Sequence, residues 1–217
     1  MSVASVAGGW AYYQFFWPRI EGLTWEIVVV EGKPVLKVDF RTNVYPVVVR
    51  LLNAEKRVVD EVEVSIPEDI PVLLRLPVMM VSRAVNVFPG TYYVRLIHKD
   101  KVLAQEPVEV VIGLEVTDVK FATKYEPILN SWLLTGLTLT IKNTGTAPVS
   151  FDMLHIGIGR TSYTIFLERV VFIDPGKEQE VSAQETIEIG PSGTYNVVIR
   201  LDLGVRVITH KTPLTVG

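Results

Sequence analysis

Histidines are the first residues to consider for metal binding or acid–base chemistry, and the chain has three. His98, His155 and His210 lie far apart in the sequence, and no two have a spacing that would let them share a metal ion. The sequence also lacks the Gly-x-Ser-x-Gly nucleophile turn, the His-Glu-x-x-His zinc motif and the Gly-x-x-x-x-Gly-Lys phosphate loop. We therefore predict a protein that is not an enzyme, with no metal site and no cofactor, and we interpret the histidines as strand residues.

A glycine pair gives weak evidence of nucleotide binding. Gly157-Ile-Gly159 has half of a dinucleotide-binding fingerprint, but the third glycine is missing and no helix is expected after it. We interpret this segment as a strand end or a bulge, where one backbone passes close to another.

The densest acidic patch is Asp60-Glu61-Val-Glu63 together with Glu68-Asp69. Oxygen-rich loops of β-sandwiches can bind calcium, but the spacing here fits a calcium loop poorly. On an alternating strand Glu61 and Glu63 face one side, and a hairpin would bring Arg50 opposite Asp60 or Glu61. The patch is therefore interpreted as a solvated strand face.

Charge and composition narrow the class of partner. The 217 residues include 21 Lys and Arg against 24 Asp and Glu, and no block of like charge is long enough to form a basic face, so nucleic acid is not an expected partner. The absence of cysteine excludes disulfides and thiolate metal sites. Hydrophobic residues make up 48% of the chain, which is typical of a folded globular protein.

From Trp25 onward, apolar residues alternate with polar ones or form short β-branched runs that Gly, Pro or Asn separates. This pattern predicts strands almost throughout, and only the segment 78–85 fits a turn or two of helix. The predicted strands are 25–31, 34–42, 46–53, 57–66, 70–76, 91–98, 102–112, 114–123, 133–142, 147–158, 163–173, 180–189, 194–202 and 205–216.

The chain resembles itself. Gly90-Thr91-Tyr92 recurs as Gly193-Thr194-Tyr195, and each triplet is followed by a last strand of the form Pro-x-x-Val. The alternating residues Leu36, Val38 and Phe40 likewise match Leu137, Leu139 and Ile141. The similarity indicates a duplication of whole domains.

These patterns predict an all-β protein of two tandem immunoglobulin-like antiparallel β-sandwiches, since each sandwich needs about 100 residues. We predict an aromatic N-terminal arm at 1–24, a first sandwich at 25–113 and a second at 114–217. Because Leu114 already begins a strand, the joint near Gly113 has almost no linker and is expected to restrict motion between the domains.

The second copy also resembles a known family. The segment Leu137–Phe151, with an alternating strand followed by Asn143-Thr-Gly145, is similar to the start of CARDB and S-layer-associated immunoglobulin-like repeats. Gly193–Val197 resembles the late hairpin of these repeats. The first copy resembles them only in its own Gly-Thr-Tyr hairpin. The resemblance implies the sandwich fold and a surface role, and it implies no particular ligand.

Physical roles can be given to the residues that carry this resemblance. Asn143 is expected to hydrogen-bond nearby backbone, and Gly145 to adopt a positive φ, which turns the chain out of a strand. Tyr92 and Tyr195 begin the penultimate strands, where a sandwich tyrosine commonly buries its ring and ties its hydroxyl to nearby backbone.

Residues 1–18 carry no charged side chain and hold 6 of the 20 aromatic residues within eight positions. These candidate interface residues are Trp10, Tyr12, Tyr13, Phe15, Phe16 and Trp17. A signal peptide is disfavoured because there is no basic region, and membrane association by residues 1–18 is an alternative that we do not favour. Two alternatives stay open: the arm packs on its own first domain, or it packs on another copy as an added strand.

The leading hypothesis is a non-enzymatic structural or adhesion-type protein of a cell surface, appendage or virion. It would self-associate partly through residues 10–17, so the expected partner is protein, including further copies of the chain. The alternative is a ligand-binding accessory module, for instance for carbohydrate, that uses the aromatics Trp132, Tyr163 or Tyr125. An enzyme built from scattered carboxylates is a third alternative, because active sites assemble in space.

Overall fold

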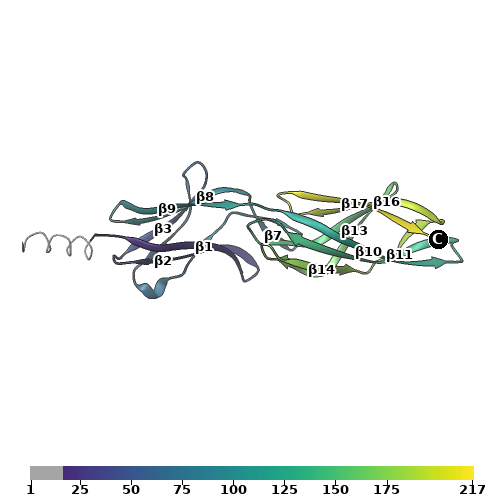
Figure 1. The fold of residues 1–217 in the computed structure, drawn as a ribbon, viewed down its shortest axis with the longest axis horizontal. Coiled ribbons are helices and arrows are strands. Elements are labelled where there is room, and N and C mark those ends of the chain that lie inside the picture. Colours follow the sequence, from purple (N-terminus) through teal and green to yellow (C-terminus); the bar gives the residue numbers. More distant parts are fainter. Residues whose placement is uncertain (1–16) are drawn as a thin grey trace, which may run out of the picture. The chain divides into compact units, whose positions relative to one another are not determined.

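The computed structural model describes residues 17–217, and their regular structure is almost entirely β-strand, with one 3-10 turn, η1 (Pro67–Asp69). The prediction of an all-β sandwich fold is confirmed. The chain divides into two compact units (Figure 1). Among the described residues, unit 1 comprises 17–30, Val35–Pro77 and Gly90–Glu109, and unit 2 comprises Glu31–Pro34, Val78–Pro89 and Val110–Gly217.

Unit 1 contains a sheet of three strands and a sheet of four. The first has the order β1 (Ile20–Val30), β2 (Lys33–Thr42), β5 (Val72–Arg75). The second has the order β4 (Val58–Val64), β3 (Val47–Leu52), β8 (Gly90–His98), β9 (Lys101–Val110). Alternation decides which face is buried: in β2, Leu36, Val38 and Phe40 are in the core while the residues between them are more exposed.

Unit 2 is built in the same way. One sheet has the order β10 (Leu114–Glu126), β11 (Ser131–Asn143), β14 (Glu178–Ala183), and β15 (Ile187–Gly190) also pairs with β11. The other has the order β13 (Thr161–Ile173), β12 (Val149–Ile158), β16 (Gly193–Asp202), β17 (Val207–Val216). Leu137, Leu139 and Ile141 of β11 are buried in its core.

The two units therefore repeat one strand order: each has a sheet with its first, second and fifth strands, to which β15 adds a further strand in unit 2, and a second sheet of four strands. The matching sequence segments occupy matching strands. Leu36 and Leu137 are both buried in the second strand, and the two Gly-Thr-Tyr triplets begin β8 and β16.

One hairpin departs from this repeat. β6 (Val78–Val81) and β7 (Ala84–Val87) pair with each other through the two-residue turn Ser82-Arg83, with Ser82 at φ 54°. The prediction of helical turns at 78–85 is therefore wrong. A short run such as Val-Met-Met-Val suits strand or helix, and here the contacts of β7 with β12 favour the extended form. The hairpin lies within the range predicted for the first sandwich, yet it groups with unit 2.

The first strand begins at Ile20, five positions before the predicted start at Trp25. The segment predicted as an arm at 1–24 therefore includes part of a sheet. Between Trp17 and the last residue, the structure has no helix with the length and apolarity needed to cross a membrane.

Candidate functional site

The residues first considered for chemistry lie in separate places. His98 is on β8 with Nδ1 2.8 Å from the carbonyl oxygen of Pro46, and Nδ1 of His155 on β12 is 2.8 Å from Oγ1 of Thr164. His210 is on β17. The described residues contain no group of three or more His, Asp or Glu side chains arranged to hold a metal ion.

The acidic patch of unit 1 is occupied by structural contacts. Arg50 and Glu61 are cross-strand partners and form an ion pair, as predicted. The Asp60 carboxylate accepts the backbone N–H of Arg75 at 2.6 Å, and Asp69 accepts the N–H groups of Ser65 and Ile66. These carboxylates therefore tie strands and turns together.

The glycine pair is a strand end, as interpreted. Gly157 lies in β12 opposite Ser162 and Val198, and Gly159 has φ +61° in the turn that follows Ile158.

Asn143 organises the turn after β11. Its Oδ1 accepts the N–H of Gly145 at 2.8 Å, as predicted, and its Nδ2 donates to the carbonyl oxygens of Ala147 and Ile173, both at 2.8 Å. The prediction of a positive φ at Gly145 is wrong. Glycine is needed there because a Cβ atom would lie 2.2 Å from the carbonyl oxygen of Val111.

The two tyrosines occupy related positions. The hydroxyl of Tyr195 donates to the carbonyl oxygen of Pro191 at 2.7 Å, so the predicted tie to nearby backbone is present in unit 2. Tyr92 is buried in unit 1, and burial raises the pKa of its hydroxyl.

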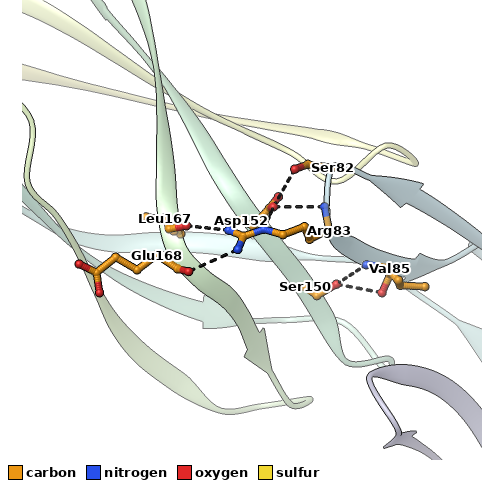
Figure 2. Close-up of polar contacts among 7 residues, drawn as sticks. All are labelled: Ser82, Arg83, Val85, Ser150, Asp152, Leu167 and Glu168. Carbon is orange, nitrogen blue, oxygen red and sulfur yellow. Dashed lines mark hydrogen bonds and ion pairs between the residues drawn. The ribbon is translucent and has the colours of Figure 1, made fainter.

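A buried carboxylate holds the β6–β7 hairpin in unit 2 (Figure 2). Asp152, on β12, has a side chain that is 1% exposed. Its Oδ2 accepts hydrogen bonds from Oγ of Ser82 at 2.7 Å, from the N–H of Arg83 at 3.1 Å and from Nε of Arg83 at 2.9 Å. The guanidinium of Arg83 also donates to the carbonyl oxygens of Leu167 and Glu168.

The ionisation of Asp152 follows from these contacts. Burial alone would raise the pKa of the carboxyl group, but the hydrogen bonds from Ser82 and Arg83 and the charge of Arg83 together hold it below the ordinary value of 3.8. Oδ1 is buried and has no hydrogen-bond partner among residues 17–217. The carboxylate is therefore charged at neutral pH and bonded through one oxygen.

A second group of polar contacts continues along β7. Oγ of Ser150 accepts the N–H of Val85 at 2.8 Å and donates to its carbonyl oxygen at 2.9 Å (Figure 2). Asn86, fully buried, accepts the N–H of Ser150 at 2.7 Å and donates to the carbonyl oxygens of Ser150 and Leu203. We name these four residues, Arg83, Asn86, Ser150 and Asp152, the hairpin lock.

Sequence reasoning missed the hairpin lock. The local sequence pointed the other way, because Val149-Ser150-Phe151-Asp152 alternates apolar and polar residues and so predicts Ser150 and Asp152 on a solvent-facing side of the strand. The sequence could not show that Asp152 has a partner 69 positions away at Arg83.

Two of the three aromatics named for the alternative of a ligand-binding module lie together in unit 2. The rings of Tyr125 and Trp132 have centroids 5.6 Å apart, with their planes tilted by 53°. They line an open cavity of about 440 Å³, which we name the aromatic cavity. Its lining residues are Tyr125, Asn130, Trp132, Pro191, Ser192 and Gly217. Tyr163 is on β13 and does not line it.

The candidate interface residues Trp10, Tyr12, Tyr13, Phe15 and Phe16 lie outside the described residues. Trp17 is described and is 59% exposed, and its carbonyl oxygen accepts a hydrogen bond from Nδ2 of Asn43 at 3.0 Å.

No family model matches the chain, and no curated protein matches it. Among solved structures, the chain is similar to one titled "Biofilm associated protein - BSP domain", with 9% identity and a TM-score of 0.31 over 90% of this chain and 29% of that chain. It is also similar to "The structure of a beta-glucuronidase from glycoside hydrolase family 2", with 15% identity and a TM-score of 0.27 over 92% of this chain and 20% of that chain. The chain thus spans less than a third of either structure, and similarities of this size carry no argument about function.

Proposed function

We propose that this chain is a non-enzymatic structural protein of a cell surface, surface appendage or virion, which associates with further copies partly through residues 10–17. The observation that carries the structural role is the hairpin lock. Its buried hydrogen bonds hold the β6–β7 hairpin in unit 2, although the chain on both sides of the hairpin belongs to unit 1. A surface location is supported by the resemblance of Leu137–Phe151 and Gly193–Val197 to S-layer-associated repeats.

The course of the chain supports a structural role. Val78–Pro89 belongs to unit 2, although the segments on either side of it, Val35–Pro77 and Gly90–Glu109, belong to unit 1. Buried hydrogen bonds to Ser150 and Asp152 fix this segment in unit 2.

Self-association is supported by the composition of the N-terminal segment. Six aromatic side chains and no charge within residues 10–17 match the composition of protein interface cores. The carbonyl oxygen of Trp17 accepts from Nδ2 of Asn43, and the N–H of Arg19 donates to Oδ1 of Asn43. Because β1 then begins at Ile20, a truncation that tests the segment should end at Phe16.

The experiment compares the full chain with a chain lacking residues 1–16 by light scattering at matched concentrations. We expect the full chain to show a mass of two or more copies and the truncated chain to show the monomer mass of about 22–23 kDa, with the β-sheet circular dichroism of the full chain retained. A full-length variant with Phe15→Ser and Phe16→Ser serves as a control for chain length. A monomeric full chain at about 100 μM would refute self-association.

A further inference from the structure

We propose that the aromatic cavity of unit 2 is a binding site for a neutral saccharide. Its volume of about 440 Å³ lies in the range of roughly 300–1,000 Å³ that small-molecule sites occupy. Such sites combine apolar and aromatic walls with a few placed polar groups, and this cavity has both.

The apolar walls are the two rings. Tyr125 is 42% exposed although its ring packs on Trp132 at a tilt of 53°, so the pair offers two faces at an angle. The C–H face of a pyranose ring packs well on an exposed aromatic ring, because both surfaces are apolar and flat. Pro191 supplies a third apolar surface.

The polar groups are held in a fixed orientation. The hydroxyl of Tyr125 donates to Oδ1 of Asn130 at 2.7 Å, which orients the amide and leaves Nδ2 as a donor with no partner among the described residues. Nε1 of Trp132 donates to Oγ of Ser192 at 3.3 Å, so the Ser192 hydroxyl keeps its own hydrogen for a further acceptor. Each aromatic ring thus orients one donor, and hydroxyl groups of a sugar are suitable acceptors.

The walls are set by the fold of unit 2. Asn130 adopts φ 49°, a conformation that asparagine tolerates, at the end of the tight turn between β10 and β11. The Pro191 segment is fixed by the hydrogen bond from Tyr195, and Trp132 is the strand partner of Gly190. A preformed site of this kind binds without the cost of ordering its own residues.

The lining favours a neutral saccharide over other occupants. None of the six lining residues is Asp, Glu, Lys, Arg or His, so no side chain of the site is charged at neutral pH, and the main-chain carboxylate of Gly217 disfavours an anionic ligand. A hydrocarbon ligand such as an acyl chain has no acceptor and would leave the two oriented donors unpaired, and unpaired buried donors cost free energy.

The test titrates the full chain with cellohexaose, xylohexaose, mannohexaose and chitohexaose, follows the indole N–H signal of Trp132 by NMR, and measures the affinity of every variant by isothermal titration calorimetry. We expect at least one of these neutral oligosaccharides to shift that signal with saturation at up to millimolar concentration. Trp132→Ala and Asn130→Gly should each weaken the binding at least tenfold, and glycine keeps the positive φ of the turn.

The matched control is Phe166→Ala, which removes an aromatic that is 67% exposed on β13 and lies outside the aromatic cavity. Its affinity should equal that of the unsubstituted chain. The proposal is overturned if none of the four sugars shifts the Trp132 signal, if Phe166→Ala weakens binding as much as Trp132→Ala, or if only a proline-rich peptide binds. Self-association by light scattering is a separate readout, so the two proposals fail independently.

Discussion

At the scale of single residues, Asp152 is the clearest case of a charged side chain that stabilises the fold through buried hydrogen bonds. An isolated carboxylate 1% exposed to solvent would favour its protonated form, and the bonds from Ser82 and Arg83 reverse that preference. A folded-state pKa below the ordinary value stabilises the fold above about pH 4, and this stabilisation is lost as the pH falls through the folded-state pKa.

Asp152→Asn should therefore lower the free energy of unfolding by about 1–3 kcal/mol at pH 7, because the charge-assisted bonds to Arg83 are lost. The difference from the unsubstituted chain should shrink as the pH falls below about 4 and through the lowered folded-state pKa of Asp152. Urea unfolding at several pH values measures this. Glu115→Gln, on the exposed face of β10, is the control, and an equal effect of the two substitutions would contradict the role of Asp152.

Substitutions at Gly145 and Gly157 compare a glycine whose added Cβ would clash with the backbone and a glycine whose added Cβ would make ordinary van der Waals contacts. A Cβ at Gly145 would lie 2.2 Å from a carbonyl oxygen, whereas at Gly157 the nearest atom would be 3.7 Å away. We expect Gly145→Ala to lower the free energy of unfolding by about 3 kcal/mol, and Gly157→Ala to change it by less than about 1 kcal/mol. Equal effects of the two substitutions in thermal unfolding would contradict this prediction, because they would show that the turn after β11 can move to accommodate a Cβ atom at Gly145.

At the scale of elements, most strands could be predicted because one face of each sheet is buried and the apolar residues alternate. The strands β2, β11 and β16 fall within about two residues of their predicted ranges. The β6–β7 hairpin could not be predicted. Its identity is decided by Ser150 and Asp152, which are more than 60 positions away along the chain, and a local pattern contains no information about such partners.

The hairpin gives a matched pair of substitutions. Asn86→Ala would leave the N–H of Ser150 and the carbonyl oxygen of Leu203 without their partner, so we expect a loss of about 2–4 kcal/mol in the free energy of unfolding. Met80→Ala, in the same hairpin but 67% exposed, should change it by less than about 0.5 kcal/mol. Denaturant unfolding measures both, and a small effect of Asn86→Ala would mean that the hairpin does not stabilise unit 2.

At the scale of the whole molecule, the repeat in the sequence corresponds to a repeated strand order, so the duplication could be read from Leu36, Leu137 and the Gly-Thr-Tyr triplets. The aromatic cavity could be predicted only in part. Tyr125 and Trp132 were candidates, with Tyr163, under the alternative of a ligand-binding module, but Asn130 and Ser192 join them only because the β10–β11 turn and the Pro191 segment fold together. The sequence-predicted boundary at Gly113 did not anticipate that Val78–Pro89 belongs with unit 2.

Amide hydrogen exchange of the full chain tests the hairpin lock most directly, because two of its bonds use backbone N–H groups of the hairpin. The amides of Arg83 and Val85 donate to side chains of Asp152 and Ser150, so they should exchange as slowly as the amides of β12 and by the same opening event. Exchange of these two amides as fast as that of Glu55, in the loop after β3, would contradict the assignment of the hairpin to unit 2 and the structural role built on it.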